Sequence, residues 1–118
     1  HHPSDLNTDH RITFEAVFAA CRPTDNYNVK SIRTFEVPSS TDWASTLHQP
    51  AFRPETFVDI TAYLNTKIEA LMAYSGEMRQ SPHPRSEEYV RALATIRGGQ
   101  VGLKFAEGFV AVKNIVEI

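Results

Sequence analysis

The sequence predicts an α/β fold with a partly parallel sheet. Apolar residues recur with the period of a helix in three segments, and two shorter segments are rich in the β-branched and aromatic residues typical of strands. Helices and strands alternate along the chain, and this order favours parallel strands joined by helices. With 118 residues, 42% of them apolar and 22% charged, the chain has the composition of one ordinary globular domain.

The first helix is expected over residues 9–22. Thr8 or Asp9 can cap its start, and Pro23 ends it because proline cannot continue a helix. One broad face of this helix is apolar and carries Ile12, Phe14, Val17, Phe18 and Cys21.

The middle of the chain alternates between strands and connections. A strand is expected over residues 29–37, ended by Pro38. Residues 39–54 have no steady period and are predicted to form a loop, and loops of this length are often functional. A short strand is expected over residues 57–60, and Thr61 follows as the cap of a long helix.

That long helix is predicted over residues 61–79. A turn is expected over residues 80–85, because two prolines fix the backbone on either side of His83. Ser86 can cap a third helix, which is acidic in its first turn and ends at the glycine pair that begins with Gly98.

The last segment, residues 101–118, is apolar and strand-like toward its end, with Phe109, Val110 and Val112 as expected core positions. Only two or three strands are apparent in the whole chain. A parallel sheet is normally covered on both faces and has more strands than this. We therefore expect the chain to be part of a larger fold.

Charge and hydropathy exclude several classes of protein. The net charge is −2 and the basic residues are scattered, which argues against nucleic-acid binding. No apolar run is long enough to span a bilayer. The single cysteine, Cys21, excludes an internal disulfide and is typical of a buried thiol in a reducing cytoplasm.

The first ten residues contain an unusual number of metal-binding side chains. His2, Asp5, Asp9 and His10 stand just before and at the start of the first helix, and His and Asp are common zinc ligands. Their spacing, however, is not a self-sufficient zinc motif. A solvated helix cap is the alternative interpretation.

Residues 2–11, HPSDLNTDHR, resemble the C-terminal zinc-ligand motif of the LmbE-like, or PIG-L, deacetylases. The resemblance continues in order along nearly the whole chain. It includes FEVPSST at 35–41, FVDIT at 57–61, PHPRS at 82–86, RGG at 97–99 and AEGF at 106–109.

The resemblance implies a zinc enzyme that removes the acetyl group from an N-acetylglucosamine-type sugar, glycoconjugate or nucleotide-sugar precursor. It implies a Rossmann-like three-layer sandwich, possible homo-oligomers, and His10 as one zinc ligand. The two other ligands and the general base belong to an N-terminal HPDD motif, which this sequence does not contain. Residues 1–118 are thus expected to be the C-terminal part of a single deacetylase domain.

The resemblance also suggests roles for other polar residues. Many members of the family stabilise the oxyanion with a histidine three residues before the zinc ligand, where this sequence has Asn7. Asn7 could donate a hydrogen bond there, or His2 or His83 could take the role, with His83 the stronger candidate. Asp9 either orients a zinc-binding ring or only caps the helix.

Four residues are expected to contact substrate. Three of them, Glu36, Ser39 and Ser40, stand at or just beyond the end of a predicted strand, where α/β proteins usually bind ligands. Arg85 can form a forked contact with a sugar hydroxyl or a phosphate. The alternatives are turn formation for the serines and simple solvation for Arg85. A non-catalytic α/β module or degenerate homologue is the alternative to an enzyme.

Overall fold

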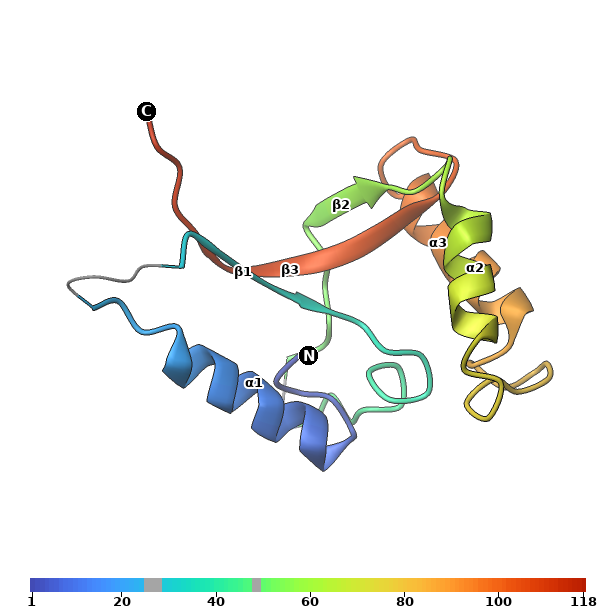
Figure 1. Cartoon of the computed structure of the whole chain (residues 1–118), viewed down its shortest axis with the longest axis horizontal. Helices are drawn as coiled ribbons and strands as arrows, with labels where there is room; N and C mark the ends of the chain where they lie inside the picture. Colours follow the sequence, from blue (N-terminus) through green and yellow to red (C-terminus); the bar gives the residue numbers. More distant parts are fainter. Residues whose placement is uncertain (25–28, 48–49) are drawn as a thin grey trace. The chain divides into compact units, whose positions relative to one another are not determined.

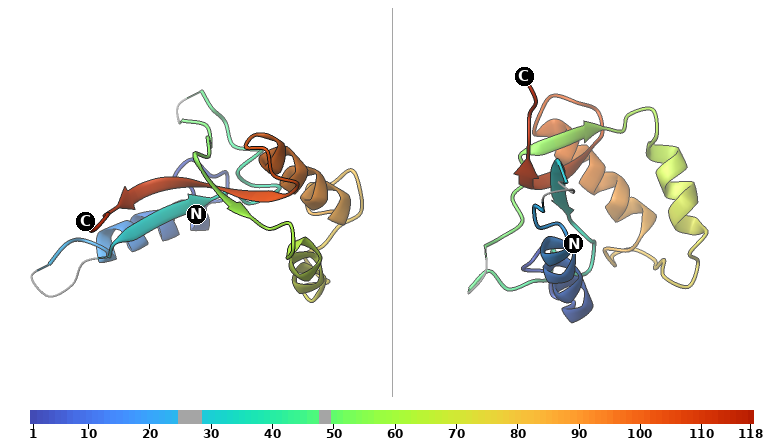
Figure 2. Two further views of the ribbon diagram at one scale, coloured as in Figure 1. Left: turned by 90° about the horizontal axis from the view of Figure 1, so that it is seen from above. Right: turned by 60° about the vertical axis from the view of Figure 1, so that its left-hand side comes forward.

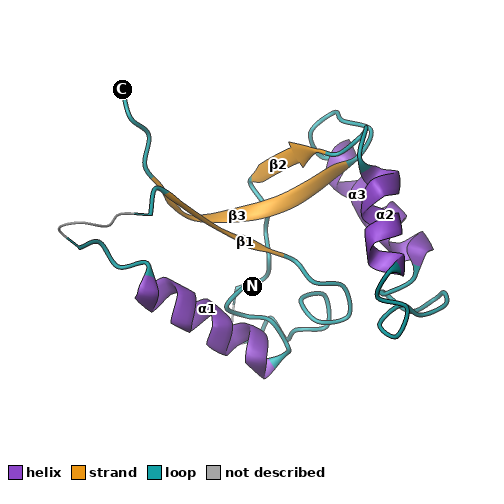
Figure 3. Ribbon diagram, in the orientation of Figure 1, coloured by secondary structure: helices purple, strands orange, loops and turns teal. Residues whose placement is uncertain are grey.

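The computed structural model describes residues 1–24, 29–47 and 50–118, and shows three helices and three strands among them (Figures 1 and 3). In chain order these elements are α1 (Thr8–Ala20), β1 (Ser31–Phe35), β2 (Thr56–Asp59), α2 (Leu64–Met72), α3 (Glu87–Gly99) and β3 (Ala106–Asn114). The protein is therefore an α/β fold, as the sequence predicts.

The chain divides into two compact units. The first contains His1–Thr56 and Phe109–Ile118, and the second contains Phe57–Gly108. Helix α1 and strand β1 belong to the first unit, and helices α2 and α3 belong to the second. Strands β2 and β3 begin in one unit and end in the other.

The sheet has the strand order β1-β3-β2. Strand β1 pairs antiparallel with β3, with Phe35 opposite Phe109, and the register shifts between Ile32 and Arg33. On the other side of β3, the amide of Glu55 donates to the carbonyl of Phe109 at 3.1 Å.

The predicted partly parallel sheet is therefore not what these strands form. Strands β1 and β2 are not neighbours, because β3 lies between them, and β3 pairs antiparallel with β1. The two helices that precede β3 instead return the chain so that β3 runs antiparallel to β1.

Helix α1 begins one residue earlier than predicted, and its cap is neither Thr8 nor Asp9. Asn7 has an extended backbone, and its side-chain oxygen accepts a hydrogen bond from the amide of Asp9 at 2.9 Å. No side chain of α1 is buried. The expected apolar face is largely open, since Ile12 and Phe18 are 57% and 51% exposed.

Helix α2 is shorter than predicted at both ends. Thr61 is not the N-cap of this helix. Its amide donates to the carboxylate of Asp59 at 2.8 Å, and this hydrogen bond forms a turn before the helix. The helix ends at Met72, and the following residues form turns, in which the amide of Glu77 donates to the carbonyl of Tyr74 at 2.8 Å.

Helix α3 confirms its predicted start and end. The Ser86 hydroxyl accepts from the amide of Tyr89 at 3.2 Å, and Ser86 is 1% exposed. Two glutamates occupy the first turn, where the positive end of the helix dipole favours them.

The apolar core lies in the second unit, where α2 packs against α3 (Figure 2). Its buried members are Ile60, Leu64, Ile68, Val90 and Ala94. The core positions predicted in the last strand are only half-buried, namely Phe109, Val110 and Val112. Within β3 the buried positions are instead Ala106 and Gly108.

None of the helices in the described part of the chain is long and apolar enough to cross a membrane.

The two glycines at the end of α3 differ in their surroundings and provide a matched test of packing. A Cβ on Gly98 would stand 2.6 Å from the backbone oxygen of Leu103, whereas nothing lies within 4 Å of a Cβ on Gly99. We expect Gly98→Ala to lower the free energy of unfolding by about 1–3 kcal/mol, because backbone must move. We expect Gly99→Ala to raise it by about 0.5–1 kcal/mol, because alanine restricts the unfolded chain. Urea denaturation measures both, and equal effects would contradict the close approach.

Candidate functional site

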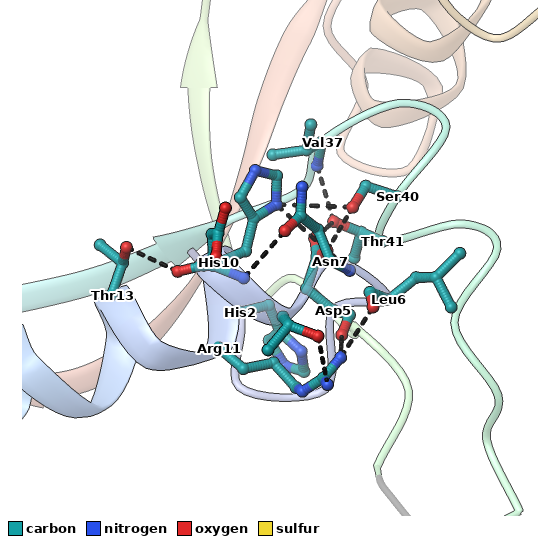
Figure 4. A network of polar contacts seen from close by, with 12 residues as sticks. His2, Asp5, Leu6, Asn7, His10, Arg11, Thr13, Val37, Ser40 and Thr41 are labelled. Carbon is teal, nitrogen blue, oxygen red and sulfur yellow. Dashed lines mark hydrogen bonds and ion pairs between the residues drawn. The ribbon is translucent and has the colours of Figure 1, made fainter.

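The segment before α1 is folded into a tight turn whose polar side chains are buried. His2, Ser4 and Asp5 are 5%, 7% and 1% exposed, and the amide of Asp5 donates to the carbonyl of His2 at 3.1 Å. Such burial requires that each polar group find a partner within the protein. Figure 4 shows the contacts that Asp5 makes with the start of α1 and with Ser40 and Thr41.

The Asp5 carboxylate accepts hydrogen bonds from two segments of the chain. One oxygen, Oδ1, accepts from the amide of Asn7 at 2.8 Å and from the Ser40 hydroxyl. The other, Oδ2, accepts from the Thr41 hydroxyl at 2.8 Å. The Nδ1 atom of His10 lies 3.1 Å from Oδ1. Asp5 thus joins the start of α1 to the loop that follows β1.

This loop is held in a shape that presents both hydroxyls to Asp5. The amides of Ser40 and Thr41 donate to the carbonyl of Val37 at 3.1 and 2.9 Å, and the Thr41 hydroxyl accepts from the amide of Val37 at 2.7 Å. Ser39 has a φ of 67°, in the left-handed region that side chains other than glycine rarely occupy.

Two opposing effects act on the pKa of the Asp5 carboxyl. Burial raises the pKa, because it removes the charged form from water. The hydrogen bonds from Ser40, Asn7, Thr41 and His10 lower it, and together they hold the pKa below its ordinary value. Asp5 is therefore ionised at neutral pH.

His2 is enclosed by its neighbours. Its Nδ1 lies 2.6 Å from the Ser4 hydroxyl, which donates to the carbonyl of Pro50 at 2.8 Å, and its ring meets the ring of Phe52 edge to face. Burial lowers the pKa of His2, and the nearby Asp5 charge only partly opposes this. His2 is thus predominantly neutral at neutral pH.

His10 has its ring fixed on two sides. Besides the contact with Asp5, its ring stacks on the ring of His1 with centroids 3.8 Å apart and planes within 11°. Its side chain is 20% exposed, so the ring remains accessible.

The structure brings four of the predicted site residues together in the first unit: Asn7, His10, Ser39 and Ser40. Glu36 is half-buried directly after β1. Asp9 is exposed, and its backbone amide donates to Asn7 while its carbonyl accepts from the Thr13 hydroxyl at 2.7 Å.

The other two predicted site residues belong to the second unit. The Nδ1 atom of His83 accepts a hydrogen bond from the amide of Arg85 at 3.0 Å, and the Arg85 guanidinium pairs with the carboxylate of Glu77. The turn around His83 is therefore organised by its own histidine.

The sequence indicates no separate role for Asp5, although its side chain is the centre of the polar network. The only available signal was the run Ser40-Thr41 beyond a predicted strand, together with an aspartate before a predicted helix. Nothing in the sequence indicates that the segment before α1 contacts the loop after β1.

His10 with Asp5 behind it is the arrangement that metal-binding histidines commonly have. Within residues 1–24, 29–47 and 50–118, however, no group of three or more His, Cys, Asp or Glu side chains is placed to hold a metal ion. No family model matches the chain.

The left-handed backbone of Ser39 provides a second matched test. We expect Ser39→Gly to be more stable than Ser39→Ala by about 1 kcal/mol, because both lose the hydroxyl but only glycine adopts this φ without strain. Thermal and urea unfolding of the two variants measure the difference. An alanine variant as stable as the glycine variant would show that this backbone conformation is wrong.

Stability should depend on pH through His2. Its pKa in the folded protein lies below the ordinary value of 6.5, so the unfolded chain binds more protons between the two values. The stabilisation is present above pH 6.5 and is lost as pH falls through the pKa of the folded state. We expect the thermal midpoint to fall over this range, and His2→Gln to remove that part of the pH dependence. An unchanged profile in His2→Gln would assign the effect to another group.

Proposed function

We propose that the protein is a zinc-dependent deacetylase that removes the acetyl group from an N-acetylglucosamine-type sugar, glycoconjugate or nucleotide-sugar precursor, with His10 as a zinc ligand. The observation that carries this proposal is the contact between His10 and the buried, ionised Asp5. Burying a carboxylate costs free energy of folding, and capping a helix does not require it. A buried carboxylate that contacts a partly exposed imidazole suits a ring that must keep one orientation. The resemblance of residues 2–11 to the zinc motif of the LmbE-like deacetylases points to the same chemistry.

Zinc, when bound, polarises the acyl carbonyl and makes water reactive near neutral pH. The residues of this chain hold and orient the participants. Asp5 fixes the ring of His10. The Asn7 side chain uses its oxygen to cap α1, so its amide nitrogen remains the group that would donate to a developing oxyanion.

The remaining predicted residues stay in their proposed roles. His83 is the alternative oxyanion donor, Arg85 and Glu36 are substrate contacts, and Ser39 and Ser40 line the loop after β1. Because the hydroxyl of Ser40 donates to Asp5, its contribution to substrate binding would come through the shape of the loop.

The proposal includes a larger domain. The other zinc ligands and the general base would come from an HPDD-containing segment outside these 118 residues. Strand β1 stands at the edge of the sheet, so the parallel strands of a Rossmann-like sandwich would add there. The free thiol of Cys21 suits a reducing cytoplasm.

One observation favours a second candidate, a non-catalytic interaction module. Helix α1 buries none of its side chains, and Ile12, Val17 and Phe18 are about half exposed. An apolar helix face of this kind is typical of a surface that another protein covers.

Zinc titration of the full-length protein by calorimetry distinguishes the two candidates. We expect binding of one zinc per chain, with His10→Ala weakening it by more than about 100-fold because one of the few ligands is lost. An N-acetylglucosamine deacetylation assay should lose activity in the same variant.

Glu15→Gln is the control, because it removes an exposed charge from the same helix. It should leave zinc affinity unchanged. Equally weak binding by the wild type, His10→Ala and Glu15→Gln would contradict the enzyme and favour the interaction module.

A further inference from the structure

The contacts of Asp5 determine which nitrogen of His10 carries the proton. Three contacts of the Asp5 carboxylate are with donors: the amide of Asn7 and the hydroxyls of Ser40 and Thr41. The Thr41 oxygen already accepts from the amide of Val37, so its own proton points to Asp5. Asp5 is therefore an acceptor at these three contacts, and the ring of His10 makes the fourth contact.

The ring of His10 must then be the donor toward Asp5. Its Nδ1 lies 3.1 Å from Asp5 Oδ1 and 3.4 Å from the Ser40 oxygen. The Ser40 proton is used on Asp5, so the Ser40 oxygen can only accept from the ring. Both neighbours of Nδ1 are acceptors, and an unprotonated Nδ1 would face two oxygens without a proton between them. The proton toward Asp5 is therefore on Nδ1, so the neutral form of the ring has its lone pair on Nε2.

We infer that Asp5 is the positioning residue of His10. It favours the neutral form of the ring that is protonated on Nδ1, and in this form the lone pair of Nε2 is free to bind a metal. The inference rests on the proposed function, because a zinc ligand needs such a lone pair. It gives Asp5 the role that the sequence suggested for Asp9. Asp9 is exposed, and its backbone amide donates to Asn7 while its backbone carbonyl accepts from Thr13.

The segment that carries Asp5 is itself braced. The Arg11 guanidinium donates to the carbonyls of Asp5 and Leu6 at 2.8 and 2.7 Å and to the Thr8 hydroxyl at 3.1 Å. Stacking of the His1 ring on His10 restricts the remaining rotation of the ligand ring. The orientation of Nε2 thus depends on Asp5 and on the stacked ring of His1.

The first test measures the tautomer of His10 directly. Long-range ¹⁵N–¹H correlation spectra of histidine-labelled wild-type protein distinguish the two neutral forms, and they need neither zinc nor substrate. We expect the form protonated on Nδ1 to predominate. Predominance of the form protonated on Nε2 in the wild type would overturn the inference without any variant.

Two isosteric variants then locate the cause. Asp5→Asn removes the charge that attracts the Nδ1 proton, so we expect it to increase the population protonated on Nε2. Asp9→Asn makes the same change on an exposed carboxylate and should leave the tautomer as in the wild type. A shift caused by Asp9→Asn and not by Asp5→Asn would assign positioning to Asp9 and reject the inference. Circular dichroism confirms that each variant is folded, and the spectrum of the wild type tests the inference by itself if Asp5→Asn unfolds.

Zinc affinity of the full-length protein separates this inference from the proposed function. We expect Asp5→Asn to weaken zinc binding by about 10–100-fold, the usual effect of losing a carboxylate behind a histidine ligand. Unchanged zinc affinity in a folded Asp5→Asn variant would reject the inference that Asp5 positions His10, and it would leave the proposed zinc enzyme intact. The expected tautomer in a protein that binds no zinc would reject the proposed function while the positioning of His10 stands.

Discussion

Burial of the Asp5 carboxylate is the constraint on which the first unit depends. An ionised group removed from water costs several kcal/mol unless donors replace its hydration. Here the donors come from Asn7, from His10, and from the Ser40-Thr41 pair beyond β1. Their convergence fixes where α1 begins, how the loop after β1 turns, and which way the ring of His10 faces. The left-handed backbone of Ser39 is tolerated because this network over-determines the loop.

The second unit is held by a different kind of force. Its buried residues are aliphatic, and they lie where α2 packs on α3. Polar contacts add to this packing, and they include a half-buried pair between Lys67 and Glu107, at 2.5 Å. Apolar packing is non-directional and tolerates exchange of similar side chains, whereas the network around Asp5 requires particular donors at particular distances. Substitutions should therefore be far less freely tolerated around Asp5.

The sequence predicts local features of this protein well and non-local ones poorly. Periodicity predicts the three helices, and Ser86 is recognisable as a cap because two glutamates and an apolar helix follow it. At α1, three successive residues could each serve as a cap, and only the backbone conformation of Asn7 decides among them. Strand direction is set by which strand returns beside β1, and hydrophobic pattern does not encode that. The sequence likewise singles out His10. The role of Asp5 cannot be predicted from the sequence, because it depends on contacts with the loop after β1, which is distant in the chain.

The pairing of β1 with β3 affects how the protein is synthesised. Strand β1 finds its partner in residues that the ribosome adds only after the whole second unit has been made. The second unit is continuous in sequence, so it can collapse during translation, while β1 stays unpaired until residues 109–114 have been made. Such distant pairing slows folding and exposes an unpaired edge in the meantime. The first unit therefore completes its strand pairing only after the second unit has been synthesised.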